Sequence, residues 1–467
     1  MAIRFYNTLT RQEDEFVPLR SGEVRLYTCG PTVYDYAHIG NFRTYLWEDL
    51  LRRFLKFRGY RVTQAMNLTD VDDKTIANAR AAGITLEDYT RRYIDAFFED
   101  IEALGIEKAE HYPRATAFIP DMARLVAKLI ERGHVYESRG SLYFKIATYP
   151  GYGRLSRLDT AAGEGQARID SDEYEKDNPR DFAVWKAPKD GEPFWQTEIG
   201  PGRPGWHIEC SAMSMKLLGE TFDIHTGGVD NIFPHHENEI AQSEAATGKP
   251  FVRYWMHAAH LVVDGEKMSK SRGNFFTLRD LAARGYDMRV VRYHLVSVHY
   301  RKPLNFTFDG LAQSQAALAR LEDLALRLGQ FGAAHNTEGA GDLAVKARER
   351  LQGMLEDLDH DLNTAGALGH LFDLVRETHT TLDTGRFGTE DLEAVREVLH
   401  AFGRIFGIEP GQRADLDAEI EDLIRRRAEA RSQRNFAESD RIRDDLLRRG
   451  IVLEDTPQGV RWKRKSA

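Results

Sequence analysis

Residues 24–67 show an apolar pattern that constrains the fold more than any other part of the chain. Val24–Thr28 predicts a strand, and a turn follows at Cys29–Thr32. Large apolar residues then recur at helical spacing until Gly59, namely Leu46, Leu50, Leu51, Phe54 and Phe57. Arg61–Asn67 predicts a second strand. Because strands joined through a helix lie parallel, this segment predicts a parallel sheet in an α/β domain.

Ligands in open parallel sheets bind at the carboxyl ends of the strands. This rule places Cys29 and the segment His38–Asn41 on the expected ligand-binding edge. A single histidine after a strand is more often an ordinary polar residue. A second segment, Lys267–Ser271, carries two lysines and two hydroxyls near Gly265, which is typical of a mobile loop that binds phosphates. The alternative is a solvated basic loop.

Residues Phe233–Glu239 contain side chains that can bind a metal ion. Pro234 is suited to the first turn of a helix, where its missing N–H costs nothing. In a helix that begins there, His235 and Glu239 share a face, and His236 lies almost as well placed. The spacing therefore leaves the choice of histidine open. The alternative is a helix N-terminus whose acids are favoured by the helix dipole.

The chain has only two cysteines, Cys29 and Cys210, and both lie in polar, Gly-containing segments. Two cysteines in 467 residues do not make a disulfide framework. Together with one imidazole and one carboxylate, they form a donor set typical of zinc. Taken singly, each cysteine is more often a small buried apolar residue than a metal ligand.

Length and composition limit the remaining classes. A chain of 467 residues predicts two to four domains, and 42% apolar with 29% charged residues is ordinary for a globular protein. No apolar run approaches the length of a membrane span, and the first residues lack a signal peptide's apolar core, so we expect a cytoplasmic protein. The net charge of −9 means that nucleic acid would have to contact local basic patches.

The pairing of His38–Asn41 with Lys267–Ser271 resembles the two signatures of class I aminoacyl-tRNA synthetases. The first signature ends here in Asn41, where the family pattern has a second histidine, so the role of that histidine falls either to the Asn41 amide or to no residue. Five further segments narrow the resemblance to cysteinyl-tRNA synthetases, and the likeness covers nearly the whole chain. These segments are Tyr27–Asp35, Asn67–Lys74, Arg203–Met213, Phe222–Asp230 and Phe233–Glu239.

The resemblance implies a site and a reaction. It implies one Zn²⁺ per chain on Cys29, Cys210, His235 and Glu239, which would settle the choice of histidine. The implied reaction activates L-cysteine with ATP, accompanied by Mg²⁺, and transfers it to the 3′ end of tRNA(Cys). The resemblance further assigns catalysis to four residues, His38, Asn41, Lys267 and Lys270. ATP binding falls to His38, Gly228, Asp230 and Lys270.

Zinc in such a site has a chemical purpose, because an apolar pocket distinguishes cysteine from serine poorly. Zinc binds a thiolate strongly and an alcohol weakly. Trp206 and His207, beside Cys210, are candidates for the amino-acid pocket, and packing at a strand end is their alternative role.

The expected architecture is a Rossmann-like parallel-sheet catalytic domain with a connective insertion, then an α-helical bundle and a small anticodon-binding domain. The boundaries that we predict are a split catalytic domain at 1–112 and 202–252, an insertion at 113–201, a region with the Lys267 loop at 253–310, a bundle at 311–407 and the anticodon-binding domain at 408–467. The bundle is predicted from helical spacing that begins with Leu311, Leu318, Leu321, Leu324 and Leu328.

The last segment, 421–467, holds 13 Lys and Arg against 9 Asp and Glu. Basic side chains interleaved with aromatic rings are typical of surfaces that bind single-stranded RNA. Composition alone favours a charged surface helix, whereas the resemblance favours anticodon binding. It points to Arg431, Phe436 and Asp440 as tRNA contacts.

Two other functions remain open at this point. An ATP-dependent cysteine:amino-sugar ligase of mycothiol synthesis shares the catalytic domain and zinc site, but it would not need the basic C-terminal segment. A non-catalytic RNA-binding protein would not need His38, Lys267, Lys270 and a complete set of zinc ligands. We therefore expect a monomeric cysteine–tRNA ligase.

Overall fold

The computed structural model describes residues 2–158, 180–334, 341–411, 414–433, 435–448, 451–456 and 459–464. The chain divides into two compact units. The first comprises Met1–Gln315, Arg348–Asp373 and Ala401–Ile408, and the second comprises Ala316–Ala347, Leu374–His400 and Glu409–Ala467. Within the described residues, no helix has the length and apolar character needed to cross a membrane. The domain boundaries and the monomeric state remain predictions.

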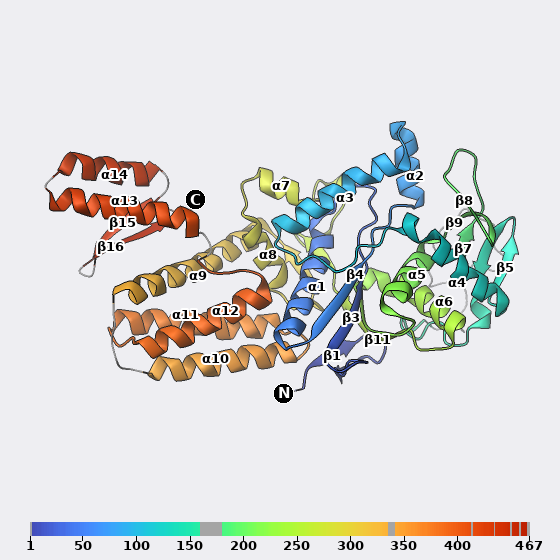
Figure 1. Cartoon of the computed structure of the whole chain (residues 1–467), viewed down its shortest axis with the longest axis horizontal. Helices are drawn as coiled ribbons and strands as arrows, with labels where there is room; N and C mark the ends of the chain where they lie inside the picture. The colour runs from blue at the N-terminus through green and yellow to red at the C-terminus, as the bar shows by residue number, and fades with distance from the viewer. Residues whose placement is uncertain are drawn as a thin grey trace. The chain divides into compact units, whose positions relative to one another are not determined.

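A four-stranded parallel sheet with strand order β11-β10-β3-β4 forms the centre of the first unit (Figure 1). Helix α1 (Ile39–Phe57) connects β3 (Glu23–Thr28) to β4 (Arg61–Met66). In the sheet register, Thr28 lies opposite both Met66 and Thr226. This arrangement confirms the parallel sheet that the pattern of residues 24–67 predicts. The sequence pattern also places the ends of α1 and β4 to within one or two residues.

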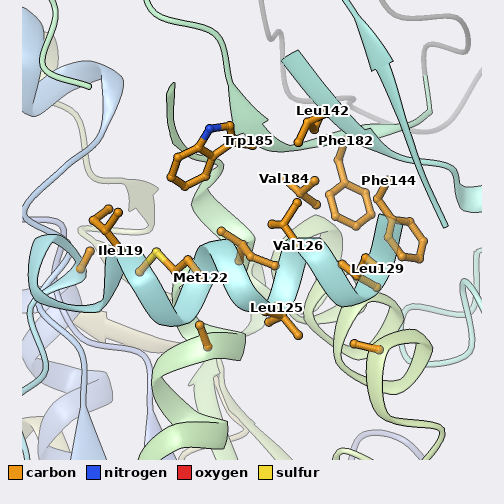
Figure 2. Packing of buried hydrophobic residues seen from close by; sticks show 14 of the residues in the cluster. Ile119, Met122, Leu125, Val126, Leu129, Leu142, Phe144, Phe182, Val184 and Trp185 are labelled. Atoms are coloured by element: carbon orange, nitrogen blue, oxygen red, sulfur yellow. The ribbon is translucent and has the colours of Figure 1, made fainter. Parts of the chain in front are cut away.

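The segment between the two halves of this sheet builds a second sheet, which is antiparallel and has the order β5-β6-β7-β9-β8. Helix α4 (Ile119–Glu131) packs its apolar face against this sheet, and Figure 2 shows Val126 and Leu129 beside Val184, Phe182 and Phe144. The same core includes Ala241 and Ala245 of helix α6. The inserted segment is therefore packed against the helix that carries Glu239, one of the predicted metal ligands.

The remaining chain is mainly helical, as the spacing of its leucines predicts. Helices α9 to α12 cover most of residues 308–406, and α13 and α14 follow. In the second unit, Ile420 and Ile424 of α13 pack with Ile442 and Leu446 of α14 and with Ile451. Strands β15 and β16 then pair antiparallel. The α/β fold with helical C-terminal parts is thus confirmed.

The remaining elements have the following bounds. The strands are β1 (Arg4–Asn7), β2 (Gln12–Glu15), β5 (Val135–Ser138), β6 (Ser141–Phe144), β7 (Phe182–Lys186), β8 (Trp195–Thr197), β9 (Gly200–Pro204), β10 (Phe222–Gly228), β11 (Val252–Ala258), β12 (Leu261–Val263), β13 (Glu266–Lys267), β14 (Leu304–Phe306), β15 (Ile451–Thr456) and β16 (Gly459–Arg464). The helices are α2 (Asp73–Ala82), α3 (Leu86–Ala103), α5 (Trp206–Leu218), α6 (Glu237–Thr247), α7 (Leu278–Ala283), α8 (Met288–Val296), α9 (Phe308–Ala334), α10 (Asp342–Asp359), α11 (Thr364–Asp383), α12 (Thr389–Phe406), α13 (Ala414–Ser432) and α14 (Phe436–Arg448).

Candidate active site

The candidate site lies at the carboxyl ends of β3 and β10, two parallel strands whose connections lead to opposite sides of the sheet. From β3 the chain crosses to β4 on one side, and β10 pairs with β3 on the other. Cys29 directly follows β3, and its N–H donates to the carbonyl of Thr226 in β10 at 3.2 Å. Such a switch point is where open α/β sheets bind their ligands.

His38 caps the N-terminus of α1, and Asn41 completes the cap. The N–H of Asn41 donates to Nδ1 of His38 at 3.2 Å, and the N–H of His38 donates to Oδ1 of Asn41 at 3.1 Å. This reciprocal pair satisfies two backbone donors at the start of the helix. In the structure, the Asn41 amide oxygen thus orients the histidine segment. A role of Asn41 toward ATP remains a proposal.

The Lys267 loop lies directly against this cap, although about 230 residues separate the two segments in sequence. The N–H of Ile39 donates to the carbonyl of Phe276 at 3.0 Å. A Cβ on Gly40 would come within 2.7 Å of Cε of Met268, so a side chain at this position would displace the end of Met268. The structure therefore brings the two predicted signature segments together.

The two signature lysines have different surroundings. Both are exposed. Lys267 ends the short strand β13, whereas Lys270 forms an ion pair with Asp35 from the loop after β3. Lys270 also lies 5.2 Å from the ring centre of Phe275. In this conformation the Lys270 ammonium is held at the sheet edge by a carboxylate.

Gly228 and Asp230 border the same edge from β10. A Cβ on Gly228 would lie 2.3 Å from Oδ1 of Asp230, so a side chain at this position would displace the Asp230 carboxylate. Burial lowers the pKa of His38, while the negative charge of Asp230 opposes that shift and the positive charge of Lys270 adds to it. The electrostatic influence of both groups on His38 indicates that the predicted ATP-binding residues converge on one place.

The four predicted metal ligands are also brought together. Cys29, Cys210, His235 and Glu239 are all buried, and their ligand atoms lie within 4.8 Å of one another. Cys29 comes from the end of β3, Cys210 from α5, and Glu239 from α6. His235 lies in the turn before α6, with Nε2 at 3.1 Å from Oε1 of Glu239.

A second set of possible ligands overlaps the first. Cys29 and Glu239 also lie within 4.8 Å of the ligand atoms of His225 and His236. Nε2 of His225 is 3.1 Å from Oε2 of Glu239, and Nε2 of His236 is 3.2 Å from Sγ of Cys29. The helical spacing in the sequence allows His236 as a metal ligand, but it gives no reason to consider His225. A histidine near the carboxyl end of a sheet strand is the signal that could have identified it.

Neighbouring groups within this cluster shift the pKa values of Cys210, His235 and Glu239. A hydrogen bond with Cys29 is the main cause that lowers the pKa of Cys210 to about 6, against the opposing effect of burial. Burial would lower the pKa of His235, but the charges of Glu239 and Cys210 outweigh it and raise this pKa to about 10. Burial likewise fails to raise the pKa of Glu239, which His225 and His235 hold at about 2.

The donor set fits a bound zinc ion. Oε1 of Glu239 is buried and accepts no hydrogen bond from the described residues, although Nε2 of His235 lies 3.1 Å away. Two ligands directed at a common ion, rather than at each other, leave such an atom without a hydrogen bond. Thiolate, imidazole and carboxylate are the donors that zinc prefers. Nδ1 of His235 lies 2.9 Å from Nδ1 of His207. Such a contact is expected for a histidine that binds a metal through Nε2 and is oriented by a hydrogen bond at its other ring nitrogen.

Trp206 and His207 lie beside the cluster at the start of α5. The Trp206 ring stacks on the His235 ring with centres 4.3 Å apart, and its side chain is 39% exposed. His207 is buried. The exposed indole ring, stacked on a predicted metal ligand, is suited to form a wall of an amino-acid pocket. The buried His207 is instead suited to orient His235. Their assignment to the pocket remains a proposal.

The helical turn that leads into α6 opens at Pro234, as the suitability of proline for a first turn indicates. Phe233 has extended backbone angles, residues 234–236 after it are helical, and regular helix α6 continues from Glu237. His235 and Glu239 face each other because this turn continues directly into α6.

Glu237 fastens the inserted segment to α6. Its carboxylate accepts from the N–H groups of Gly153, Leu155 and Ser156 at 2.9, 3.1 and 2.7 Å, and from Oγ of Ser156 at 2.8 Å. Leu155 packs in the same core as Cys29 and Cys210. The loop of residues 153–156 thereby closes one side of the metal cluster.

We expect Glu237→Gln to lower the free energy of unfolding by about 1–3 kcal/mol. In glutamine, an NH₂ group takes the place of one carboxylate oxygen, and this group cannot accept a hydrogen bond from the backbone N–H groups that it faces. Urea unfolding measures this loss. Glu220→Gln serves as a control, since Glu220 forms only an exposed ion pair with Lys249 and should change stability by less than about 1 kcal/mol. Equal losses in both variants would contradict the anchoring role of Glu237.

Glu48 is a buried carboxyl group behind the sheet edge. It lies in α1, where Oε1 accepts from Oγ1 of Thr226 at 2.7 Å, while Oε2 has no hydrogen-bond partner among the described residues. Burial is the main cause that raises its pKa from about 4.5 to about 8. The folded protein therefore keeps this proton at neutral pH, whereas the unfolded chain loses it.

This difference predicts a pH dependence of stability. The contribution of Glu48 to the free energy of unfolding is fully present below about pH 4.5. It is lost as the pH rises toward about 8, because the unfolded chain releases the Glu48 proton at lower pH than the folded chain does. We expect the contribution of Glu48 to fall by about 2 kcal/mol between about pH 6 and pH 7.5. Denaturant unfolding at these pH values should show a smaller decline for Glu48→Gln than for the unmodified chain. Parallel declines would contradict the assignment.

The predicted tRNA contacts lie apart from this site in sequence and belong to the second unit. Arg431 is near the end of α13, Phe436 begins α14, and Asp440 lies one turn later. All three are exposed, Phe436 to 62%. Asp440 pairs with Arg443 at 3.3 Å. The contact of these residues with tRNA remains a proposal.

Comparison with known proteins identifies the family. Residues 15–316 match the model of the tRNA synthetases class I (C) catalytic domain, residues 354–408 match a DALR domain, and residues 413–462 match the cysteinyl-tRNA ligase anticodon-binding domain. The chain is 52% identical to a cysteine–tRNA ligase of Solibacter usitatus, over 100% of both chains. It is 49% identical to one of Brachyspira hyodysenteriae, over 99% of both.

A solved structure shows the same fold at much lower sequence identity. The methionyl-tRNA synthetase of Mycobacterium tuberculosis in complex with methionyl-adenylate aligns with a TM-score of 0.66 and 17% identity, covering 84% of this chain and 93% of that chain. The full-length relatives and the catalytic-domain match together establish the family. The chain therefore belongs to the cysteine–tRNA ligases, a family of class I tRNA synthetases.

Proposed function

We propose that this ligase recognises cysteine through a zinc ion held by Cys29, Cys210, His235 and Glu239, and activates it with ATP at the adjoining sheet edge. The observation that carries the proposal is the buried convergence of these four donors within 4.8 Å of one another, with the exposed Trp206 ring stacked on His235. Bound zinc would supply a Lewis acid that takes up the substrate thiolate and discriminates against the hydroxyl of serine.

The surrounding residues would prepare this site. His207 orients His235 through their Nδ1 contact, and Glu237 holds the loop that closes the cluster. Trp206 would cover the substrate side chain and exclude water. The hydrogen bond with Cys29 lowers the pKa of Cys210 and so favours its thiolate at neutral pH.

In the first step, a carboxylate oxygen of cysteine attacks the α-phosphate of ATP and displaces pyrophosphate, giving cysteinyl-adenylate. His38, with a lowered pKa and a fixed orientation, would donate a hydrogen bond to the phosphates. Lys267 and Lys270 would offset the charge that develops on pyrophosphate, and Mg²⁺ would accompany ATP. Asp230 would accept hydrogen bonds from the ribose next to Gly228.

In the second step, a hydroxyl of the 3′-terminal ribose of tRNA attacks the acyl carbon and releases AMP. We assign recognition of the anticodon to the C-terminal part, with Arg431, Phe436 and Asp440 as contacts. The match of residues 413–462 to an anticodon-binding domain supports tRNA, rather than an amino sugar, as the acceptor.

The test is cysteine-dependent ATP–pyrophosphate exchange by purified protein whose zinc content has been measured. Serine is assayed in parallel, and charging of tRNA follows. We expect exchange with cysteine alone, about one zinc per chain, and charged tRNA. Exchange without charging would instead favour the amino-sugar ligase. No exchange in spite of bound zinc would overturn the catalytic proposal.

A further inference from the structure

Four tyrosine rings form an accessible surface beside the candidate site. Tyr34 and Tyr36 come from the loop after β3, and Tyr89 and Tyr93 come from α3. The ring of Tyr93 has its centre 5.2 Å from those of both Tyr36 and Tyr89, and the hydroxyl of Tyr89 donates to the carbonyl of Tyr34 at 2.8 Å. All four side chains are partly exposed. We call this group the tyrosine surface.

Two cations lie on these rings without a carboxylate partner. The Arg92 guanidinium is 5.6 Å from the ring centres of both Tyr36 and Tyr93, and it donates to the Tyr36 hydroxyl at 3.0 Å. The Lys74 ammonium is 4.9 Å from the centre of Tyr34. Both cations are exposed, and neither forms an ion pair within the described part of the chain. Their charge is therefore available to an anionic ligand.

The tyrosine surface is joined to the phosphate-binding edge. Asp35, between Tyr34 and Tyr36, holds Lys270 of the signature loop. On the other side, Arg279 of α7 lies 5.0 Å from the Tyr36 ring centre and pairs with Glu99 of α3 at 2.7 Å. Figure 1 shows α3 and α7 near each other in the first unit. A ligand on these rings would thus lie next to the proposed adenylate.

We propose that the tyrosine surface, with Lys74 and Arg92, binds the single-stranded 3′ end of tRNA and leads its terminal ribose to the adenylate. This inference rests on the proposed function, because that function places the adenylate at the adjoining edge. Aromatic rings stack on unpaired bases, and cations without partners neutralise phosphates. A single strand of nucleotides needs this combination, whereas a paired duplex would present no exposed bases to the rings.

The test removes charge from the surface without disturbing its rings. The double variant Lys74→Gln/Arg92→Gln is compared with Arg91→Gln. Arg91 is the next residue of α3, is equally exposed, and pairs with Glu87 at 2.6 Å instead of contacting a ring. Two measurements are made, ATP–pyrophosphate exchange without tRNA and binding of tRNA(Cys) transcripts. One transcript is complete, and the other lacks its unpaired 3′ nucleotides.

We expect the double variant to keep its exchange rate within about twofold and to bind the complete transcript about tenfold more weakly. Its affinity for the shortened transcript should equal that of the unmodified protein, because the replaced side chains would contact only the 3′ end, which this transcript lacks. Arg91→Gln should leave all values nearly unchanged. Equal weakening toward both transcripts, or no weakening, would overturn the proposal. Absence of exchange in the unmodified protein would instead refute the proposed function.

A ring variant provides an independent measurement. Tyr93→Leu keeps an apolar side chain but removes the stacking surface, and it should weaken binding of the complete transcript by about 5- to 100-fold. Thermal unfolding establishes whether this variant folds. If it does not fold, the result of the charge variants decides alone, since Lys74 and Arg92 are exposed.

Discussion

Replacing Cys210 with serine is expected to empty the metal site and to reduce cysteine-dependent ATP–pyrophosphate exchange by more than about 100-fold. Serine keeps the size of the side chain but replaces a thiolate with a hydroxyl that binds zinc weakly. The remaining donors, Cys29, His235 and Glu239, offer one ligand fewer, and we expect these three to bind the ion too weakly to retain it. Zinc content by atomic absorption and exchange at saturating ATP measure the two effects separately.

The control distinguishes the two overlapping sets of ligands. Cys210 and His235 belong only to the proposed set, whereas His225 and His236 belong only to the other. We expect His225→Asn to retain about one zinc per chain and to bind it about tenfold more weakly, because His225 contacts Oε2 of Glu239 and only orients that ligand. Loss of zinc from His225→Asn together with full zinc in Cys210→Ser would show that the second set holds the metal.

Replacing Lys270 with alanine is expected to reduce the turnover number of pyrophosphate exchange by about 100- to 1,000-fold. The Lys270 ammonium is the group that we propose to offset charge on the leaving pyrophosphate, and such contacts contribute mainly in the transition state. We therefore expect KM for ATP to change much less than kcat. Steady-state exchange at several ATP concentrations separates the two constants.

Arg272→Ala is the matched control for this loss. Arg272 lies in the same loop, is also exposed, and pairs with Glu266 at 2.8 Å rather than with a group at the sheet edge. Its removal should change kcat by less than about threefold, since an exposed ion pair contributes little. If both variants lost activity equally, the effect would belong to the loop as a whole. An unchanged kcat in Lys270→Ala would remove Lys270 from the catalytic assignment.

Local patterns predict the elements that carry the site. Helical spacing from Leu46 to Phe57 and the turn at Cys29 predict β3, α1 and β4, because each of these signals depends on neighbouring residues. The donor chemistry of two cysteines, a histidine and a glutamate likewise indicates zinc from residue types alone. Proline chemistry also indicates the helical turn that opens at Pro234, whereas the wide turn that joins it to α6 at Glu237 depends on the folded chain.

By itself, the sequence determined the fold class, the parallel sheet edge and the chemical character of the metal and phosphate ligands. Only the tertiary structure decided which groups meet: His225 with Glu239, Asp35 with Lys270, Glu237 with the loop of residues 153–156, and Lys74 and Arg92 with the tyrosine surface. The physical reason is the range of the interactions. Periodicity and caps arise from residues a few positions apart, whereas most of these pairs join segments that only the folded chain places within a few ångströms.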